Sequence, residues 1–215
     1  MPPERRNKAP NGGTREGTVP EWARGPTQGT TLTGASSPPS RPKHDCGDLD
    51  MRIARDGTWF YKGSPIGRKE LVCLFASVLK REPDGSYLLE TPVERGRITV
   101  EDAPFVAVEM VWRHCDCGTG LAPQQCLTFR TNCDEVVTAG RKHPIRIQLD
   151  RRTREPRPYV TIRPGLEAKI NRAVFYEMVA LAVTERMDGR EIMGVWSEGV
   201  FFPIDEVTAL DMAAE

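Results

Sequence analysis

The chain carries one pattern twice: residues 66–94 read IGRKELVCLFASVLKREPDGSYLLETPVE, and residues 170–198 read INRAVFYEMVALAVTERMDGREIMGVWSE. The identical positions are Ile66 and Ile170, Arg68 and Arg172, Ala76 and Ala180, Asp84-Gly85 and Asp188-Gly189, and Glu94 and Glu198. The turns and apolar faces also coincide in this register, which predicts a duplicated architecture. Such an architecture buries a surface between its halves, and a cleft between halves is a common place for a ligand.

Helix and turn signals follow one another in each copy. An apolar stripe at helical spacing predicts a helix from about Arg68 to Arg81, and its members are Leu71, Leu74, Phe75, Val78 and Leu79. Asn171 is a good N-cap for the second helix, which we expect to end at Asp188-Gly189. Short strand-like runs fill the middle of the chain; 145–149, for example, alternates apolar and polar residues. The predicted class is therefore α+β, with duplicated hairpin-helix-hairpin units joined by a β-meander.

The first 47 residues differ in composition from the rest. They contain eight Pro and seven Gly, with Trp22 as the only aromatic residue, so the segment lacks the apolar surface that would offset its chain entropy. We expect a disordered tail at 1–47, an N-terminal α+β unit at 48–103 and a C-terminal β-rich unit at 104–215. No apolar run has signal-peptide length, so the expected location is the cytoplasm, where the cysteines would be free thiols.

The charge balance excludes some classes of partner. The last 168 residues carry 23 basic and 26 acidic side chains, so there is no basic surplus for a nucleic-acid backbone. No apolar run is long enough to span a membrane. The sequence has no Gly-rich phosphate loop, no Ser/His/Asp order and no conventional metal signature, and we expect no cofactor.

Several longer strings resemble a known family. They include 47–61 (GDLDMRIARDGTWFY), 63–68 (GSPIGR), 100–105 (VEDAPF), 127–132 (LTFRTN) and 158–160 (PYV). With Thr91-Pro92-Val93-Glu94 and Val195-Trp196, these strings resemble the bacterial Domain of Unknown Function 1285 family over about residues 47–203.

The resemblance implies a duplicated core whose C-terminal half is a pleckstrin-homology-like barrel. It also implies a cleft between the halves that holds a nucleotide-like ligand in a signalling role, and it implies no enzymatic activity. The chain departs from the family pattern at 113–126, where His114 and three cysteines occupy what is a shorter hairpin in the family, and in its long N-terminal tail.

Two groups of residues are candidates for binding an anion. Arg68 and Arg172 stand at the first turns of the matched helices, where free N–H groups and a guanidinium suit a phosphate or carboxylate; the alternative is a surface ion pair. Arg130, Thr131 and Asn132 end an apolar strand and could fix a base or ribose, or form an Asx-type turn.

Acidic and aromatic residues complete the candidate set. Glu101 and Asp102 could bind a metal or exchange protons, although holding the interface between halves is the better-supported role. Trp59 or Trp196 could line the pocket and stack on a base, with core packing as the alternative.

The cysteines of the central loop raise the question of zinc. His114, Cys115, Cys117, Cys126 and Cys133 lie close in sequence, but their spacing is not the C-x2-C arrangement of a tetrahedral site. Exposed thiols are the favoured interpretation, and no metal site is predicted.

These features favour a non-catalytic, cytosolic binding module for a small anionic, nucleotide-like ligand, with a role in signal transduction. One alternative is an enzyme, such as a phosphoesterase that uses Glu101 and Asp102. Another is a scaffold that binds a protein partner.

Overall fold

The computed structural model describes residues 43–114, 125–150 and 152–206, and these residues form mostly β-structure. The two helices are α1 (Lys69–Ser77) and α2 (Arg172–Val179). The strands are β1 (His44–Ile53), β2 (Trp59–Tyr61), β3 (Ser64–Pro65), β4 (Leu79–Arg81), β5 (Tyr87–Glu90), β6 (Glu94–Val100), β7 (Phe105–His114), β8 (Gln125–Thr131), β9 (Val136–Thr138), β10 (Ile145–Leu149), β11 (Pro156–Arg163), β12 (Leu166–Ile170), β13 (Val183–Met187), β14 (Arg190–Ser197) and β15 (Val200–Glu206).

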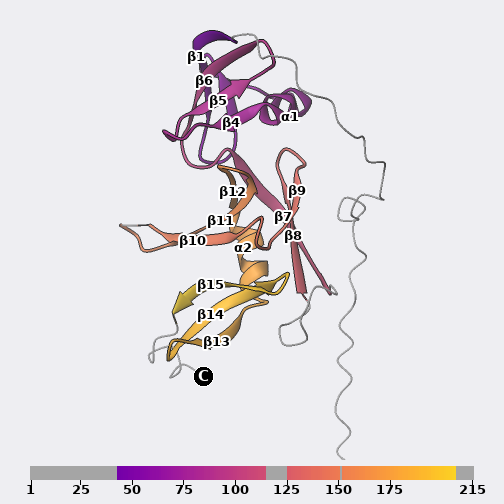
Figure 1. Cartoon of the computed structure of the whole chain (residues 1–215), viewed down its shortest axis with the longest axis vertical. Helices are drawn as coiled ribbons and strands as arrows, with labels where there is room; N and C mark the ends of the chain where they lie inside the picture. Colours follow the sequence, from indigo (N-terminus) through magenta and orange to yellow (C-terminus); the bar gives the residue numbers. More distant parts are fainter. Residues whose placement is uncertain (1–42, 115–124, 151, 207–215) are drawn as a thin grey trace, which may run out of the picture.

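The N-terminal half is one six-stranded sheet in the order β3-β2-β1-β6-β5-β4, with α1 beside it (Figure 1). β1 turns into β2 at Asp56-Gly57, and Ile53 pairs with Trp59. The centre of the sheet is the parallel pair β1–β6, whereas the hairpins on either side are antiparallel. The Asp56 carboxylate accepts the Thr58 N–H at 2.9 Å, an Asx-type contact that stabilises the tight turn.

The C-terminal half contains two further sheets. Strands β10-β11-β12-β7-β8-β9 form the second sheet, and β13-β14-β15 form the third, which lies at the opposite end of the molecule from β1 (Figure 1). Ser197 ties them together, because its buried hydroxyl accepts from the Leu127 N–H and donates to the Ala139 carbonyl.

One hydrophobic core runs through both halves. Its largest fully buried side chains include Trp59, Phe105, Phe129 and Met178, so residues of the first sheet, the second sheet and α2 all contribute. The two halves are consequently packed on each other rather than joined by a linker.

The expected fold class is wrong. Among the described residues the chain forms three sheets and two short helices, not an α+β fold of hairpin-helix-hairpin units. The C-terminal half also does not form a closed barrel among the described residues: its strands divide between two sheets, and the larger one has β10 and β9 as unpaired edges. The helices were predicted to be too long, because some residues with helical apolar periodicity pair as strands instead.

The helix boundaries show this effect. α1 ends at Ser77, and Leu79–Arg81 is a strand paired with Tyr87–Leu89, although 68–81 was expected to be helical throughout. α2 begins as expected: Asn171 Oδ1 accepts the Val174 N–H at 2.8 Å. It ends at Val179, nine residues before the Asp188-Gly189 turn, which instead connects β13 to β14.

The expected tail falls mostly on residues 1–42, which lie outside the described residues. β1 begins at His44, inside the segment 1–47. Lys43 Nζ binds the Glu90 carboxylate at 2.5 Å, and the His44 N–H donates to the Val93 carbonyl at 2.8 Å. None of the helices within the described ranges has the length and hydropathy needed to cross a membrane.

Candidate functional site

Thr131 and Asn132, predicted as ligand-binding residues, form a turn and a contact between the two halves. The buried Thr131 hydroxyl accepts hydrogen bonds from two backbone N–H groups of its own turn. Asn132 Oδ1 accepts the Val106 N–H at 3.0 Å, and Asn132 Nδ2 donates to the Gly57 carbonyl at 3.4 Å. Both side chains therefore have structural partners.

Arg130, next to them, lies between two carboxylates. Its guanidinium donates to Glu109 through Nε at 3.1 Å and through a second, shorter bond, and to Asp134 at 2.7 Å. Lys69 of α1 binds Asp134 as well, at 2.7 Å, and this bond is the main reason why the pKa of Asp134 is lowered. The positive charge of Arg130 is thus already neutralised within the protein.

Glu101 and Asp102 have cationic partners of their own. Glu101 pairs with Arg52 and also accepts the Arg55 N–H. The Asp102 side chain is 11% exposed and accepts from Tyr159 Oη at 2.7 Å and from Lys169 Nζ at 3.1 Å. Burial of Tyr159, followed by its bond to Asp102, raises the tyrosine pKa to about 12.

The remaining predicted residues belong to different elements: Trp59 to β2, Arg68 to the start of α1 and Arg172 to α2. Trp59 is 1% exposed and stacks on Phe75, with ring centroids 6.2 Å apart, so it belongs to the core. Arg68 is exposed at the start of α1, and its side chain makes no capping hydrogen bond. Arg172 starts α2 and donates to Tyr176 Oη at 2.8 Å. None of the eight predicted residues lines either of the two cavities described below.

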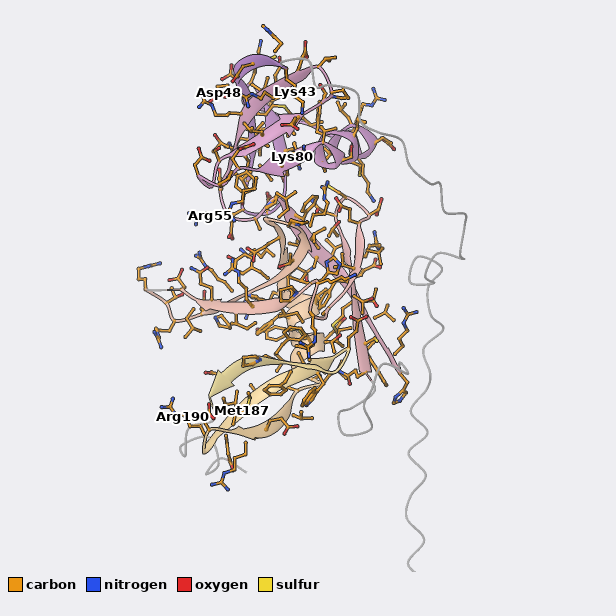
Figure 2. All side chains as sticks on the ribbon, in the orientation of Figure 1. Lys43, Asp48, Arg55, Lys80, Met187 and Arg190 are labelled. Atoms are coloured by element: carbon orange, nitrogen blue, oxygen red, sulfur yellow. The ribbon has the colours of Figure 1, made fainter. Side chains whose placement is uncertain are left out.

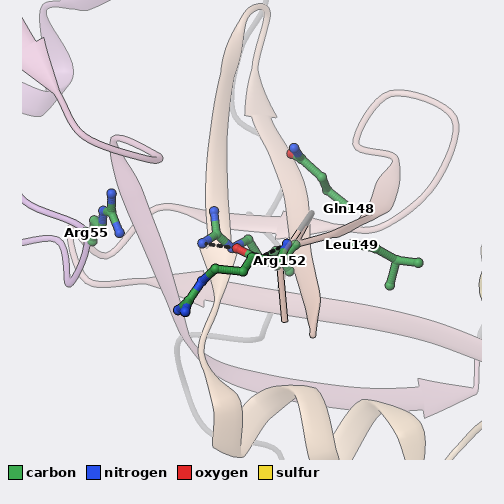
Figure 3. Close-up of a pocket in the computed structure, with 6 residues that line it drawn as sticks. Arg55, Gln148, Leu149 and Arg152 are labelled. Atoms are coloured by element: carbon green, nitrogen blue, oxygen red, sulfur yellow. Dashed lines mark hydrogen bonds and ion pairs between the residues drawn. The ribbon is translucent and has the colours of Figure 1, made fainter. Parts of the chain in front are cut away.

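A cavity of about 450 Å³ lies between the two halves, and we call it the arginine cavity. Arg55 contributes to it from the β1–β2 turn, and the β10–β11 hairpin supplies the rest of the lining: Gln148, Leu149, Asp150, Arg152 and Arg157. Arg55 lies at the edge of the N-terminal half that faces the second sheet (Figure 2). Figure 3 shows Arg152 on the Arg55 side of the hairpin, with Gln148 and Leu149 farther from Arg55.

The charges of the arginine cavity are only partly balanced. Arg157 pairs with Asp150 at 2.7 Å. The Asp150 carboxylate also accepts the backbone N–H groups of Thr153 and Arg152, which are the main causes of its lowered pKa. The structure gives the guanidinium groups of Arg55 and Arg152 no ion pair within its described residues, so the cavity has an excess of positive charge.

The hairpin itself fixes the positions of these arginines. The Asp150 N–H donates to the Glu155 carbonyl at 2.9 Å, and the Arg154 N–H donates to the Asp150 carbonyl at 3.0 Å. Strand pairing then places Gln148 opposite Arg157. These backbone bonds and this strand register place Arg152 and Arg157 at one end of the second sheet.

The arginine cavity has the chemistry of an anion-binding site. Guanidinium groups bind phosphate and carboxylate through paired N–H donors. The lining contains no histidine, thiol or hydroxyl that could act as a nucleophile or general base. Sequence reasoning missed Arg55, Arg152 and Arg157; the dense run of arginines from 151 to 157 was a signal that could have drawn attention to the hairpin.

A second cavity, of about 490 Å³, lies in the C-terminal half beside β9, and we call it the edge cavity. Its polar lining is Thr138, Arg141, Lys142, His143 and Glu198. His143 Nδ1 lies 2.9 Å from the Thr161 carbonyl, and a Cβ added at Gly140 would come within 2.2 Å of Glu198 Oε2. The Glu198 side chain therefore lies directly against the Gly140 backbone.

The cysteines do not assemble into a metal site within the described residues, where no group of three or more His, Cys, Asp or Glu side chains could hold an ion. Cys115 and Cys117 lie outside those residues. Cys126 is buried and disulfide-bonded, contrary to the expectation of exposed free thiols. Cys133 is a buried free thiol in the turn that follows β8.

Comparisons with known families agree with the resemblance found in the sequence. The family model for the DUF1285 N-terminal domain matches residues 40–103, and the model for the DUF1285 C-terminal domain matches residues 104–204. The chain belongs to the DUF1285 family. Both family models describe domains of unknown function.

Solved structures include similar DUF1285 proteins. A DUF1285 family protein from Silicibacter pomeroyi is 45% identical, with a TM-score of 0.69 over 82% of this chain and 93% of the other. Another, from Shewanella baltica, is 28% identical, with a TM-score of 0.46 over 62% of this chain and 91% of the other. No curated protein matches this DUF1285 chain.

Proposed function

We propose that this DUF1285 protein is a non-catalytic module that binds a small anionic, nucleotide-like ligand between its two halves and acts in cytoplasmic signal transduction. The observation that carries the proposal is the arginine cavity, where Arg55 of one half faces Arg152 and Arg157 of the other. A ligand there would contact both halves at once. Binding could then be coupled to the packing between them.

The lining indicates which part of a nucleotide would be recognised. The guanidinium groups of Arg55 and Arg152, with Arg157 beside Asp150, favour a phosphate chain, whereas among the described lining residues Leu149 is the only apolar one and none is aromatic. We therefore expect affinity to rise from mono- to triphosphate and to depend little on the base.

The enzyme alternative receives less support. Glu101 and Asp102 are each held by a cationic side chain, and the hydroxyl beside Asp102 is that of Tyr159, which donates its proton to a hydrogen bond with this carboxylate. A phosphoesterase that used these carboxylates would need their ion pairs to break. Otherwise it would need another catalytic residue beside them, which the described residues do not supply.

The test is a thermal-shift and calorimetric titration with nucleoside mono-, di- and triphosphates. A ligand present at 100 times its dissociation constant should stabilise the folded protein by about 2.7 kcal/mol. Arg152→Ala should weaken the best ligand by about tenfold or more, because loss of a charge-assisted hydrogen bond costs about 1.5–3 kcal/mol. Arg55→Ala should do the same from the opposite half.

Two controls separate this site from others. Arg186→Ala removes an exposed arginine of β13 that lies outside the cavity, and Arg68→Ala tests the helix start predicted from the sequence. Neither should weaken binding. If no phosphate compound shifts the melting temperature, the proposal fails; if Arg68→Ala alone weakens binding, the ligand lies elsewhere.

A further inference from the structure

The outer side of β9 has backbone groups that no other described strand pairs with. β9 is the last strand of the second sheet, so β8 is its one partner among the described strands. Two hydrogen bonds fix which backbone groups point to β8. The Thr131 N–H donates to the Glu135 carbonyl, and the Ala139 N–H donates to the Leu127 carbonyl. In an antiparallel ladder the backbone groups of successive residues point alternately to the two sides. The N–H and C=O groups of Val137 therefore also point to β8, whereas those of Val136 and Thr138 point outward.

The surroundings of this edge are suited to a chain in extended conformation. The edge cavity of about 490 Å³ lies against Val136, Val137 and Thr138. The Val136 side chain is 40% exposed, although a valine side chain in a strand is usually packed against neighbouring residues. An added strand would satisfy the outward backbone groups and cover this side chain.

The basic side chains beside the edge cavity indicate which end of an added strand would carry acidic residues. The turn between Gly140 and His143, closed by the Gly140 N–H to the His143 carbonyl, exposes Arg141 and Lys142 just beyond the end of β9. Neither cation has an ion pair with another described residue, and the single opposing carboxylate in the lining is Glu198. At the other end of β9, Asp134 and Glu135 are already paired with basic side chains.

We propose that β9 is a docking edge for an extended acidic peptide segment of a partner protein. The segment adds as a strand parallel to β9 through the outward backbone groups of Val136 and Thr138, places an apolar residue over Val136 and places its C-terminal acidic residues at Arg141 and Lys142. This site is separate from the arginine cavity, so the proposal stands or falls independently of the proposed ligand.

The first measurement is amide hydrogen exchange in the free protein. The outward amides of Val136 and Thr138 should exchange fast, while the Val137 amide, bonded to β8, should be protected. Protection of Val136 and Thr138 in the free chain would show that the edge is already covered and would overturn the proposal.

The binding test uses a fluorescein-labelled peptide of sequence Thr-Val-Thr-Val-Glu-Glu, capped at both ends, followed by anisotropy. Two matched probes change one property each: one carries N-methyl groups at alternate residues, and the other ends in Lys-Lys. We expect the acidic probe to bind and each altered probe to bind at least tenfold more weakly. Failure of the acidic probe to bind, or equal binding of either altered probe, overturns the proposal.

Variants of the protein provide the complementary test. Val136→Pro removes an outward N–H and leaves the bonds to β8 intact, and Arg141→Ala with Lys142→Ala removes the charge. Each should weaken the acidic probe at least tenfold, whereas Arg186→Ala should not. Equal binding to both altered proteins contradicts the proposed site. If the free chain self-associates and Val136→Pro abolishes this, the occupant is a second copy and the peptide proposal is wrong.

Discussion

Gly57 and Gly63 have similar backbone conformations in different surroundings. Their φ angles are +85° and +79°. A Cβ at Gly57 would lie 2.7 Å from Val106 Cγ2 and 3.0 Å from Asn132 Nδ2, whereas a Cβ at Gly63 would meet nothing within 4 Å. Gly57 thus allows the contact between the two halves, as well as the turn.

We expect Gly57→Ala to destabilise the protein by about 2–4 kcal/mol, the sum of the left-handed backbone cost and the clash. Gly63→Ala should cost only about 1 kcal/mol, from the backbone alone. Urea denaturation of both variants measures the difference. Equal losses would show that the contact at Val106 adjusts without cost.

Glu90 shows how one carboxyl group makes stability depend on pH. Lys43 and Lys80 both donate to its carboxylate at 2.5 Å and lower its pKa to about 2, from the ordinary 4.5. Because the folded-state pKa is lower than the unfolded one, this stabilisation is complete above about pH 4.5 and is lost as the pH falls towards 2.

Glu90→Gln should therefore reduce the unfolding free energy at neutral pH, and the gap from wild type should close on acidification to about pH 2. Denaturant unfolding at a series of pH values tests this. Glu70→Gln, at an exposed glutamate of α1 without an ion pair in the described structure, is the control. A gap that stays constant with pH would contradict the expected role of the lysines.

At the level of elements, Arg163 holds the end of α1 against the second sheet. Its guanidinium donates to the carbonyls of Ala76 at 2.6 Å and Ser77 at 3.2 Å, and to Glu135 at 3.0 Å. These carbonyls belong to the last turn of the helix, which carries partial negative charge. Burial raises the pKa of Glu135, and the nearby Arg163 opposes that rise.

Arg163→Ala should cost about 2 kcal/mol, because helix carbonyls and a half-buried carboxylate lose a charged donor. It should also raise the pKa of Glu135 further. Adding Glu135→Gln should recover part of the loss, which a double-mutant cycle by chemical denaturation would detect. Additive losses would show that the two side chains act independently.

The helices and strands show most clearly which features could be predicted from the sequence and which could not. The Asn171 cap was predictable because it depends on one residue and its own helix. The strand β4 was not, because its pairing with β5 overrides the helical periodicity of Leu79. The ion pair between Arg130 and Glu109 could not be predicted for a similar reason, because only the β7–β8 pairing brings these two residues together. Arg55 and Arg152 likewise become neighbours only through the packing of the two halves.

At the scale of the whole molecule, the first residues of β1 help to close the N-terminal sheet. Lys43 binds Glu90, His44 pairs beside Glu94, and Arg95 binds Asp45 at 3.2 Å. A chain that lacks 1–47 should melt roughly 3–6 °C below one that lacks 1–42, since about 1–2 kcal/mol of hydrogen bonding and charge pairing is lost. Calorimetry of both truncated chains tests this. Identical melting temperatures would mean that β1 contributes to stability only from Asp48 onward.

The parallel pairs have a consequence for synthesis on the ribosome. β1 pairs with β6, and β7 pairs with β12, so each earlier strand emerges long before its partner. At about 5–20 residues per second, the span from His44 to Glu94 takes roughly 3–10 s to translate. During that time β1 exposes an open edge, and the helix end that Arg163 will hold stays uncovered. The nascent N-terminal half should therefore bind chaperones until β6 has left the exit tunnel, and its helix end should stay accessible until Arg163 has left it too.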